Sequence, residues 1–176
     1  MIHVLPPRRL RGAKISTLDE PLDGWAQAMA EERITGNEAS ALLYGPEGAG
    51  KSYVAAAVAN VLLEAGWQMA WLDCSVWPNT FDDSRELADD ASSVGALVLD
   101  DLGREPKVMR NDVSRVIIHR FNRGLWTIYT TNLNVNEKDP EDCEIAKVYS
   151  RALRSRLLGQ SDVILMDGRD RRKPNG

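Results

Sequence analysis

The segment "LLYGPEGAGKSYVAAAV", at positions 42–58, constrains the fold of this chain more than any other part of the sequence. An apolar run leads into a glycine-rich turn, the turn ends in Lys51 and Ser52, and an alanine-rich helical pattern follows. The turn matches G-x-x-x-x-G-K-[ST], and a strand before it with a helix after it is the context that this phosphate-binding motif requires. In such a turn, backbone N–H groups and the positive end of the helix dipole face phosphate oxygens. A glycine-rich turn without a ligand would not explain a lysine at the start of the helix, so we expect bound phosphate here.

The phosphate loop supplies most of the expected ligand-binding residues. Lys51 is expected to reach the β- and γ-phosphates of a nucleotide, and the Ser52 hydroxyl is expected to bind Mg²⁺. The residues predicted to contact the nucleotide here are Gly45, Pro46, Glu47, Gly48, Ala49, Gly50, Lys51, Ser52 and Tyr53. The loop therefore predicts a nucleotide together with a magnesium ion.

Short apolar runs alternate with helical patterns along the rest of the chain. Each run is nearly continuous in apolar character, which is typical of parallel strands that are covered on both faces. Strands are expected at 41–44, 69–73, 96–99, 126–130 and 163–166, and helices at about 23–33, 52–65 and 111–123. The alternation predicts an α/β domain of three layers, with a five-stranded parallel sheet between helices.

Two adjacent carboxylates follow the third expected strand. The segment "ALVLDDLG" places Asp100 and Asp101 after four apolar residues. Many buried strands end in aspartate, so the pair alone is weak evidence for a catalytic site. Together with the phosphate loop it becomes strong evidence. Neighbouring residues of a strand point in different directions. Asp100 is therefore expected to face the metal ion, and Asp101 is expected to polarise the attacking water.

A polar residue also follows the fourth expected strand, in "WTIYTTNLN". In a sheet whose first and third strands carry nucleotide chemistry, the tip of the strand between them lies close to the γ-phosphate. Asn132 is therefore expected to position the water. The alternative is that Asn132 only begins a turn after the strand.

The distribution of charge limits the kinds of partner. A net charge of −4 argues against a protein that coats nucleic acid with its whole surface. Basic residues still gather at both ends and in "RVIIHRFNRG", where they either contact a DNA backbone or form a solvated surface. The sequence has no run of about 18 apolar residues and no secretory signal at its start, so we expect a cytoplasmic protein without a membrane partner. Cys74 and Cys143 lack the spacing of a zinc site or a disulfide framework and are expected to be free thiols.

Four segments in order along the chain carry a resemblance to a known family. "GPEGAGKS", "LVLDDLG", "TIYTTNL" and "LRSRLLGQSDVILMDGRDRR" resemble the AAA+ ATPases of the DnaC/IstB-like helicase-loader branch, which is related to the DnaA initiator. The lead-in "LPPRRLRGAKISTLD" is similar to the segment that these proteins place beside the adenine. The resemblance implies ATP and Mg²⁺ as cofactors and the strand order 5-1-4-3-2. It also implies one AAA+ domain over residues 1–176, with a basic lead-in at 1–20 and a basic tail at 169–176.

The same resemblance assigns roles to single residues. Asp100 becomes the magnesium-side carboxylate, Asp101 the catalytic one, and Asn132 the first sensor. Arg156 lies in the box that supplies an arginine finger to the neighbouring subunit, which implies a homo-oligomer with shared sites. Arg151 and Arg154 are alternative fingers, and a solvated basic helix face is the alternative for all three. The implied catalytic set is Lys51, Asp101, Asn132 and Arg156.

The second sensor of this family is an arginine in a Gly-x-x-x-Arg pattern near the end of the domain. Gly168 and Arg172 match that spacing, which makes Arg172 a predicted nucleotide contact, and Arg169 and Arg171 are close enough to compete. After Asn132 only 176 − 132 = 44 residues remain. We expect them to form one helix and one strand, without a helical lid.

The resemblance implies an ATP-hydrolysing replication accessory protein that loads the replicative helicase, and the basic segments make single-stranded DNA an additional candidate contact. Only about forty residues precede the phosphate loop, where family loaders carry a helicase-gripping domain, so the mode of partner binding stays open. An IstB-type transposase helper shares all of these motifs and differs in its partner. Two other classes are alternatives. A small-molecule P-loop kinase would carry a lid and a substrate-binding insertion instead of a late arginine box. A nucleotide-gated adaptor would use ATP to order the domain, with negligible turnover.

Overall fold

The computed structural model describes residues 5–34, 40–135 and 143–167, and its centre is a five-stranded sheet in which all neighbouring strands are parallel. The strands are β1 (Ser40–Tyr44), β2 (Met69–Asp73), β3 (Ala96–Leu102), β4 (Thr127–Thr131) and β5 (Ser161–Leu165). Their order across the sheet is β2-β3-β4-β1-β5. Read from the other edge, this is the expected order 5-1-4-3-2, so the predicted sheet is confirmed.

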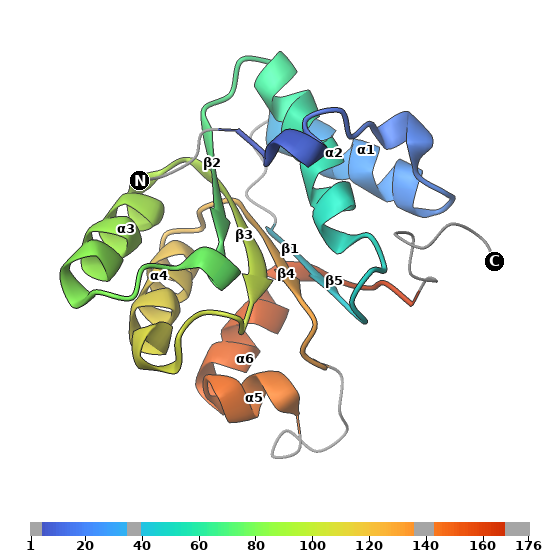
Figure 1. Cartoon of the computed structure of the whole chain (residues 1–176). Helices are drawn as coiled ribbons and strands as arrows, with labels where there is room; N and C mark the ends of the chain where they lie inside the picture. Colours follow the sequence, from blue (N-terminus) through green and yellow to red (C-terminus); the bar gives the residue numbers. More distant parts are fainter. Residues whose placement is uncertain (1–4, 35–39, 136–142, 168–176) are drawn as a thin grey trace.

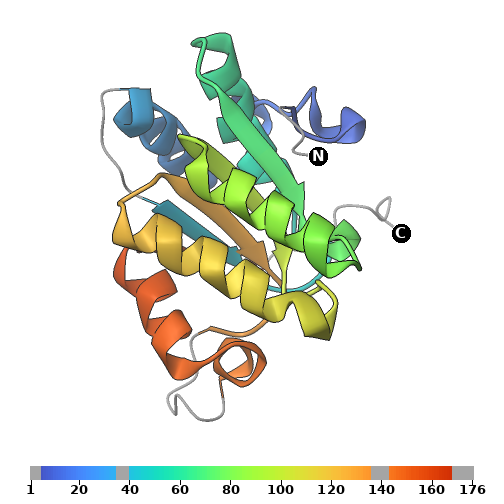
Figure 2. The same ribbon diagram turned by 90° about the vertical axis from the view of Figure 1, so that its left-hand side faces the viewer.

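Helices cover both faces of the sheet, as Figure 1 shows. They are α1 (Leu22–Ile34), α2 (Lys51–Glu64), α3 (Phe81–Ser93), α4 (Arg110–Asn122), α5 (Glu144–Val148) and α6 (Arg151–Gly159). Short 3₁₀ turns are η1 (Arg8–Leu10), η2 (Ile15–Thr17), η3 (Cys74–Val76) and η4 (Lys107–Met109). The pair α1 and α2 packs on one face, while α3 and α4 lie side by side with α6 on the other (Figure 2). The predicted three-layer α/β architecture is therefore confirmed.

The core is split by the sheet into two apolar clusters. Along β1, Ala41 and Leu43 pack into the cluster shared with α1 and α2, whereas Leu42 and Tyr44 pack into the cluster shared with α3, α4 and α6. Successive strand residues point to opposite faces, so a strand covered on both faces is apolar at every position. This burial explains why the strands read as nearly continuous apolar runs.

The helix α3 is absent from the elements that the sequence predicts. Its sequence is rich in acidic residues, and its buried face consists mainly of small side chains, which give a weak apolar signal. Ser84 on that face accepts a hydrogen bond from Trp77 Nε1 (2.9 Å) and donates one to Asp112 Oδ2 (2.5 Å). These polar contacts hold α3 against α4 together with Leu87, Ala88 and Ala91, which pack into the core cluster shared with α4.

The part after Asn132 also differs from the expectation of one helix and one strand. Two short helices, α5 and α6, precede β5. Within the described residues there is no separate helical lid. No helix there combines the length and apolar character needed to cross a membrane. Cys74 and Cys143 are both buried free thiols, as expected.

Candidate active site

A cavity of about 690 Å³ opens at the carboxyl ends of the strands. It is lined by the lead-in, the phosphate loop, the first turn of α2 and the ends of β2, β3 and β4. The lining residues are Arg9, Leu10, Thr17, Glu47, Gly48, Gly50, Lys51, Ser52, Tyr53, Asp73, Ser75, Asp101 and Asn132. Open parallel sheets bind ligands at this edge, and the volume is that of an ordinary small-molecule site.

The phosphate loop has the conformation that its glycines were expected to permit. Gly50 caps α2 with φ +96°, and Gly45 has φ +142°. A Cβ on Gly45 would lie only 2.1 Å from the carbonyl oxygen of Met166, so the loop can pass β5 only without a side chain there. Lys51 is 5% exposed and donates from Nζ to the carbonyl oxygens of Gly45 (2.8 Å) and Pro46 (2.7 Å). These contacts hold the ammonium group over the loop.

Asp100 is buried beside the phosphate loop. Its Oδ1 accepts hydrogen bonds from the hydroxyls of Ser52 (2.8 Å) and Thr130 (2.5 Å). Burial raises the pKa of Asp100 to about 6, although both hydroxyl donors lower it. The Ser52 hydroxyl and the Asp100 carboxylate are hard oxygen ligands of the kind that fits Mg²⁺ when phosphates and water complete the shell. The described part of the chain contains no group of three His, Cys, Asp or Glu side chains that could hold a metal ion.

The two carboxylates lie together in a β-bulge of β3. Leu99 pairs with Tyr129 and Leu102 pairs with Thr131, so β3 contains one more residue than β4 between these pairs. Asp101 lies in the bulge with φ +55°, and its N–H donates to Thr130 Oγ1 (2.9 Å). A bulge turns a side chain away from its usual direction, and a non-glycine residue at positive φ is strained. Asp101 consequently lines the cavity, whereas Asp100 stays against Ser52.

Asn132 lies immediately after β4 and lines the same cavity. The turn that contains it is fixed by Thr131, whose Oγ1 donates to the carbonyl oxygen of Leu102 (2.7 Å) and accepts from the N–H of Leu133 (3.1 Å). Its place beside the γ-phosphate and its role in orienting water stay predictions.

Several lining residues are missing from the predicted set. Arg9, Leu10 and Thr17 come from the lead-in, which only its likeness to the family indicated. Thr17 Oγ1 lies 2.9 Å from the hydroxyl of Tyr53, so the lead-in meets a predicted nucleotide contact at this edge. Asp73 ends β2 directly opposite Asp100 of β3 and accepts from the N–H (2.8 Å) and hydroxyl (2.6 Å) of Ser75. The sequence feature that could have identified Asp73 as a site residue is its place as a carboxylate at the end of an apolar strand.

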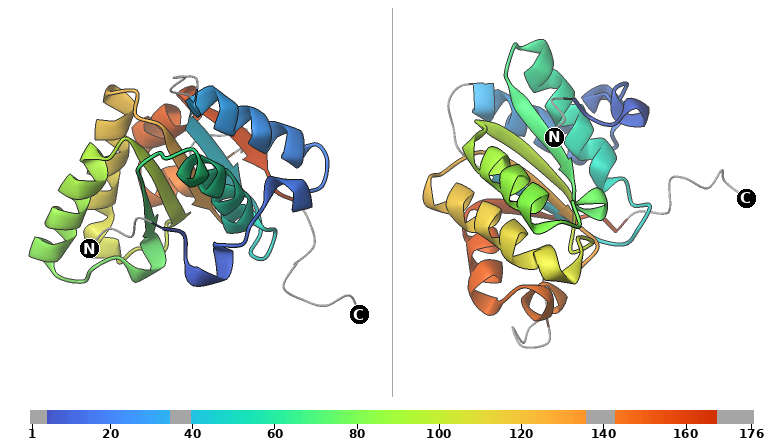
Figure 3. Two further views of the ribbon diagram at one scale, coloured as in Figure 1. Left: turned by 90° about the horizontal axis from the view of Figure 1, so that it is seen from above. Right: turned by 60° about the vertical axis from the view of Figure 1, so that its left-hand side comes forward.

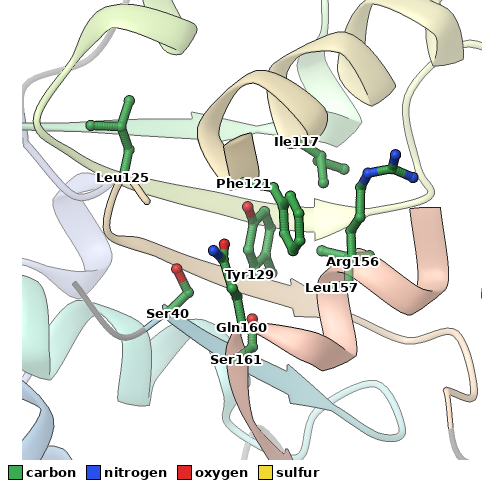
Figure 4. A pocket seen from close by; sticks show the side chains of 9 residues that line it. All are labelled: Ser40, Ile117, Phe121, Leu125, Tyr129, Arg156, Leu157, Gln160 and Ser161. Carbon is green, nitrogen blue, oxygen red and sulfur yellow. The ribbon is translucent and has the colours of Figure 1, made fainter. Parts of the chain in front are cut away.

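The arginines of the predicted finger box lie away from this cavity. Arg156 donates to the carbonyl oxygen of Ala152 on its own helix (3.1 Å), and its guanidinium lies 5.8 Å from the ring centre of Phe121. Figure 4 shows this arginine on α6 beside Phe121 of α4. Arg154 instead donates from Nε (3.1 Å) and Nη2 (2.9 Å) to the carbonyl oxygen of Val135. The residues of the predicted second sensor, Gly168, Arg169, Arg171 and Arg172, lie outside the described residues.

A buried carboxylate next to the site was not predicted. Glu105 is 3% exposed and accepts hydrogen bonds from the N–H of Gly103 (3.0 Å) and the hydroxyl of Tyr149 (2.8 Å). Arg110 Nε lies 3.5 Å from the same carboxylate, at ion-pair distance but without hydrogen-bond geometry. Burial and the Glu105 charge raise the pKa of Tyr149. The carboxylate thus joins the loop after β3 to the junction between α5 and α6, and nothing in its local sequence separates it from a surface glutamate.

Comparisons with known proteins find no matching family model. The chain is 27% identical over 157 residues to the replicative helicase loader DnaI of Bacillus subtilis, a match that covers 80% of this chain and 50% of DnaI. It is 31% identical over 116 residues to the replicative helicase loader DnaC of Escherichia coli, a match that covers 60% of this chain and 47% of DnaC. The chain therefore spans about half the length of the curated relatives that it matches.

Solved structures share the fold. A crystal structure of DnaI superimposes with a TM-score of 0.70 at 23% identity, covering 94% of this chain and 93% of that chain. The replication initiator DnaA bound to AMPPCP and single-stranded DNA superimposes with a TM-score of 0.67 at 14% identity, covering 92% of this chain and 50% of that chain. The predicted resemblance is confirmed: the chain is similar in sequence to DnaI and DnaC, and it shares its fold with the solved structures of DnaI and DnaA.

Proposed function

We propose that this chain, an AAA+ relative of the DnaI and DnaC helicase loaders, is an ATPase that helps to load the replicative helicase. The observation that carries the proposal is the cavity at the carboxyl end of the sheet. There the phosphate loop, the bulge of β3 and the tip of β4 bring together Lys51, Ser52, Asp101 and Asn132. Each of these groups has a separate task in phosphoryl transfer to water.

The chemistry assigned to these groups follows from their positions. Lys51 binds the β- and γ-phosphates, and the loop N–H groups and the N-terminus of α2 orient them. Ser52 and Asp100 would hold Mg²⁺, which when bound neutralises phosphate charge. Asp101, turned into the cavity by the bulge, polarises the attacking water, and Asn132 orients it. The proposed domain covers the whole chain, with its lead-in beside the nucleoside.

Hydrolysis is proposed to depend on a second copy of the chain. Arg156 would enter the neighbouring subunit's site and neutralise charge on the transferred phosphoryl group, and Arg172 would act as the second sensor. The helicase partner is supported by the matched relatives, which are named replicative helicase loaders. Contact with single-stranded DNA is supported by the basic lead-in and by the similarity to a DnaA that binds it.

The test compares two variants in nucleotide binding and steady-state ATPase assays. Lys51→Ala should abolish nucleotide binding or turnover, and Asp101→Asn should retain binding while losing hydrolysis. Mixing Arg156→Ala with Lys51→Ala protein should restore part of the activity. Both groups are intact at each interface where the Arg156→Ala subunit supplies the phosphate loop and the Lys51→Ala subunit supplies the arginine. Unchanged ATPase in either single variant would refute the assignment, and no restoration at any mixing ratio would argue for a monomeric mechanism.

The partner is tested by pull-down with the replicative helicase, with and without ATP. Nucleotide-dependent capture is expected. Failure to bind the helicase, together with binding to a transposase, would favour the transposase-helper alternative.

A further inference from the structure

The lead-in is attached to α2 through the side chain of Asn60. The Nδ2 atom of Asn60 lies 3.3 Å from the carbonyl oxygen of Leu10, 3.2 Å from that of Arg11 and 2.8 Å from that of Ala13. One amide group carries two N–H donors, so the three carbonyls share them. Leu10 and Ala13 are also buried in the core cluster that contains α2. Figure 3 shows the blue lead-in lying against this helix.

The attached segment forms one wall of the nucleotide cavity. Arg9 and Leu10 line the cavity, and Leu10 is one of the residues whose carbonyl Asn60 holds. Asn60 itself is not among the lining residues. It lies nine residues after Lys51, which corresponds to about 13 Å along a helix. The phosphate loop is at the N-terminal end of α2, so this wall faces the part of a nucleotide that is remote from its β- and γ-phosphates.

We propose that Asn60 is a positioning residue for the nucleoside half of the bound nucleotide. By holding three carbonyls of the lead-in, it keeps the wall that meets the base and ribose ordered before the nucleotide arrives. Binding then does not have to supply the ordering entropy of that segment, and a wall that is already ordered gives tighter binding. The inference rests on the proposed function, since it concerns the same cavity.

The hypothesis predicts that Asn60 affects binding of the nucleoside but not of the phosphates, so it can be tested with a ligand that lacks the nucleoside. Titration calorimetry would measure Kd for ATP, ADP and inorganic tripolyphosphate, each with Mg²⁺, in wild type and in Asn60→Ala. Alanine is the best helix former, so the variant is expected to keep its fold, which thermal unfolding checks. Asn122→Ala is the matched control, because Asn122 is exposed at the end of α4 in the opposite helix layer.

In Asn60→Ala, Kd should rise about tenfold for ATP and ADP. A tenfold rise corresponds to a loss of about 1.4 kcal/mol in binding free energy, which is close to the net contribution of a typical hydrogen bond. Kd for tripolyphosphate should stay the same, and Asn122→Ala should change neither. Asn60→Asp keeps the shape of the side chain but has no N–H donor. It should raise the ratio of Kd for ATP to Kd for tripolyphosphate at least as much as Asn60→Ala does. The added charge repels both ligands, and it repels the more highly charged tripolyphosphate at least as strongly as ATP, so repulsion by itself would not raise that ratio.

Three results would overturn the inference. Unchanged ATP affinity in Asn60→Ala would show that the attachment is unimportant for binding. An equal loss for ATP and tripolyphosphate would show that Asn60 supports the phosphate loop or the fold and not the nucleoside wall. Wild-type protein that binds no ATP at all would refute the proposed function first, and the inference with it.

Discussion

Substituting Asp100 by asparagine should stabilise the protein while removing a group that the proposed chemistry needs. Burial raises the pKa of Asp100 from an ordinary 3.8 to about 6, and Asp101 and Asp73 add to the rise, while the Thr130 and Ser52 hydroxyls lower it. The folded state therefore binds the Asp100 proton more tightly than the unfolded chain does. The associated stability is fully present below about pH 4 and is lost as the pH rises through about 6.

The size of the effect follows from the two pKa values. The difference between 3.8 and about 6, at 1.36 kcal/mol for each pKa unit, corresponds to about 3 kcal/mol in the free energy of unfolding above pH 6. Asparagine does not ionise, and its Oδ1 can accept the same two hydroxyl hydrogen bonds. Asp100→Asn should thus raise the free energy of unfolding by up to about 3 kcal/mol at about pH 7, and by almost nothing at about pH 4.

Urea unfolding over this pH range, with Mg²⁺ chelated and no nucleotide, measures the difference. Asp90→Asn is the matched control, since Asp90 is exposed on α3 and its replacement should change stability by less than about 0.5 kcal/mol at either pH. A nucleotide titration of the same variant should show weakened Mg²⁺-dependent ATP binding. The burial argument fails if the variant and wild type are equally stable at about pH 7, or if any difference is independent of pH.

Three further substitutions test the fold and the phosphate loop. Arg120 is fully buried and donates to three main-chain carbonyls. Arg120→Met should therefore lower the free energy of unfolding, measured by urea unfolding, by about 3 kcal/mol. A loss below about 1 kcal/mol would contradict this role. Tyr149→Phe removes a donor from the buried Glu105 carboxylate and should cost about 1–3 kcal/mol by the same assay, and a neutral result would mean that other donors replace it. Gly45→Ala should abolish ATP binding measured by calorimetry, because the added Cβ would lie 2.1 Å from the Met166 carbonyl oxygen; retained affinity would show that the loop can shift.

Local patterns in the sequence were sufficient to predict the three-layer α/β class and the parallel strands, and to place a phosphate-binding motif between β1 and α2. The loop from Gly45 to Ser52 carries its chemistry in consecutive residues, and apolar runs of strand length mark the sheet. The positions of Asp101 and Asn132 could be expected because parallel strands bring their carboxyl ends to one edge. The strand order came from the family resemblance, since the runs alone do not say which strands are neighbours.

Long-range packing decided the remainder, and it leaves little trace in a single sequence. Helix α3 packs through small and polar side chains as well as Leu87. The bulge that turns Asp101 into the cavity exists only in the pairing of β3 with β4. Glu105 is buried where Tyr149, from the α5–α6 junction, donates a hydrogen bond to it. Asn60 reads as an ordinary polar residue of α2 until the lead-in folds across it. The local sequence determines which helix or strand each segment can form. The role of a polar side chain depends on the segment that packs against it, because burial and hydrogen-bond partners are properties of the assembled fold.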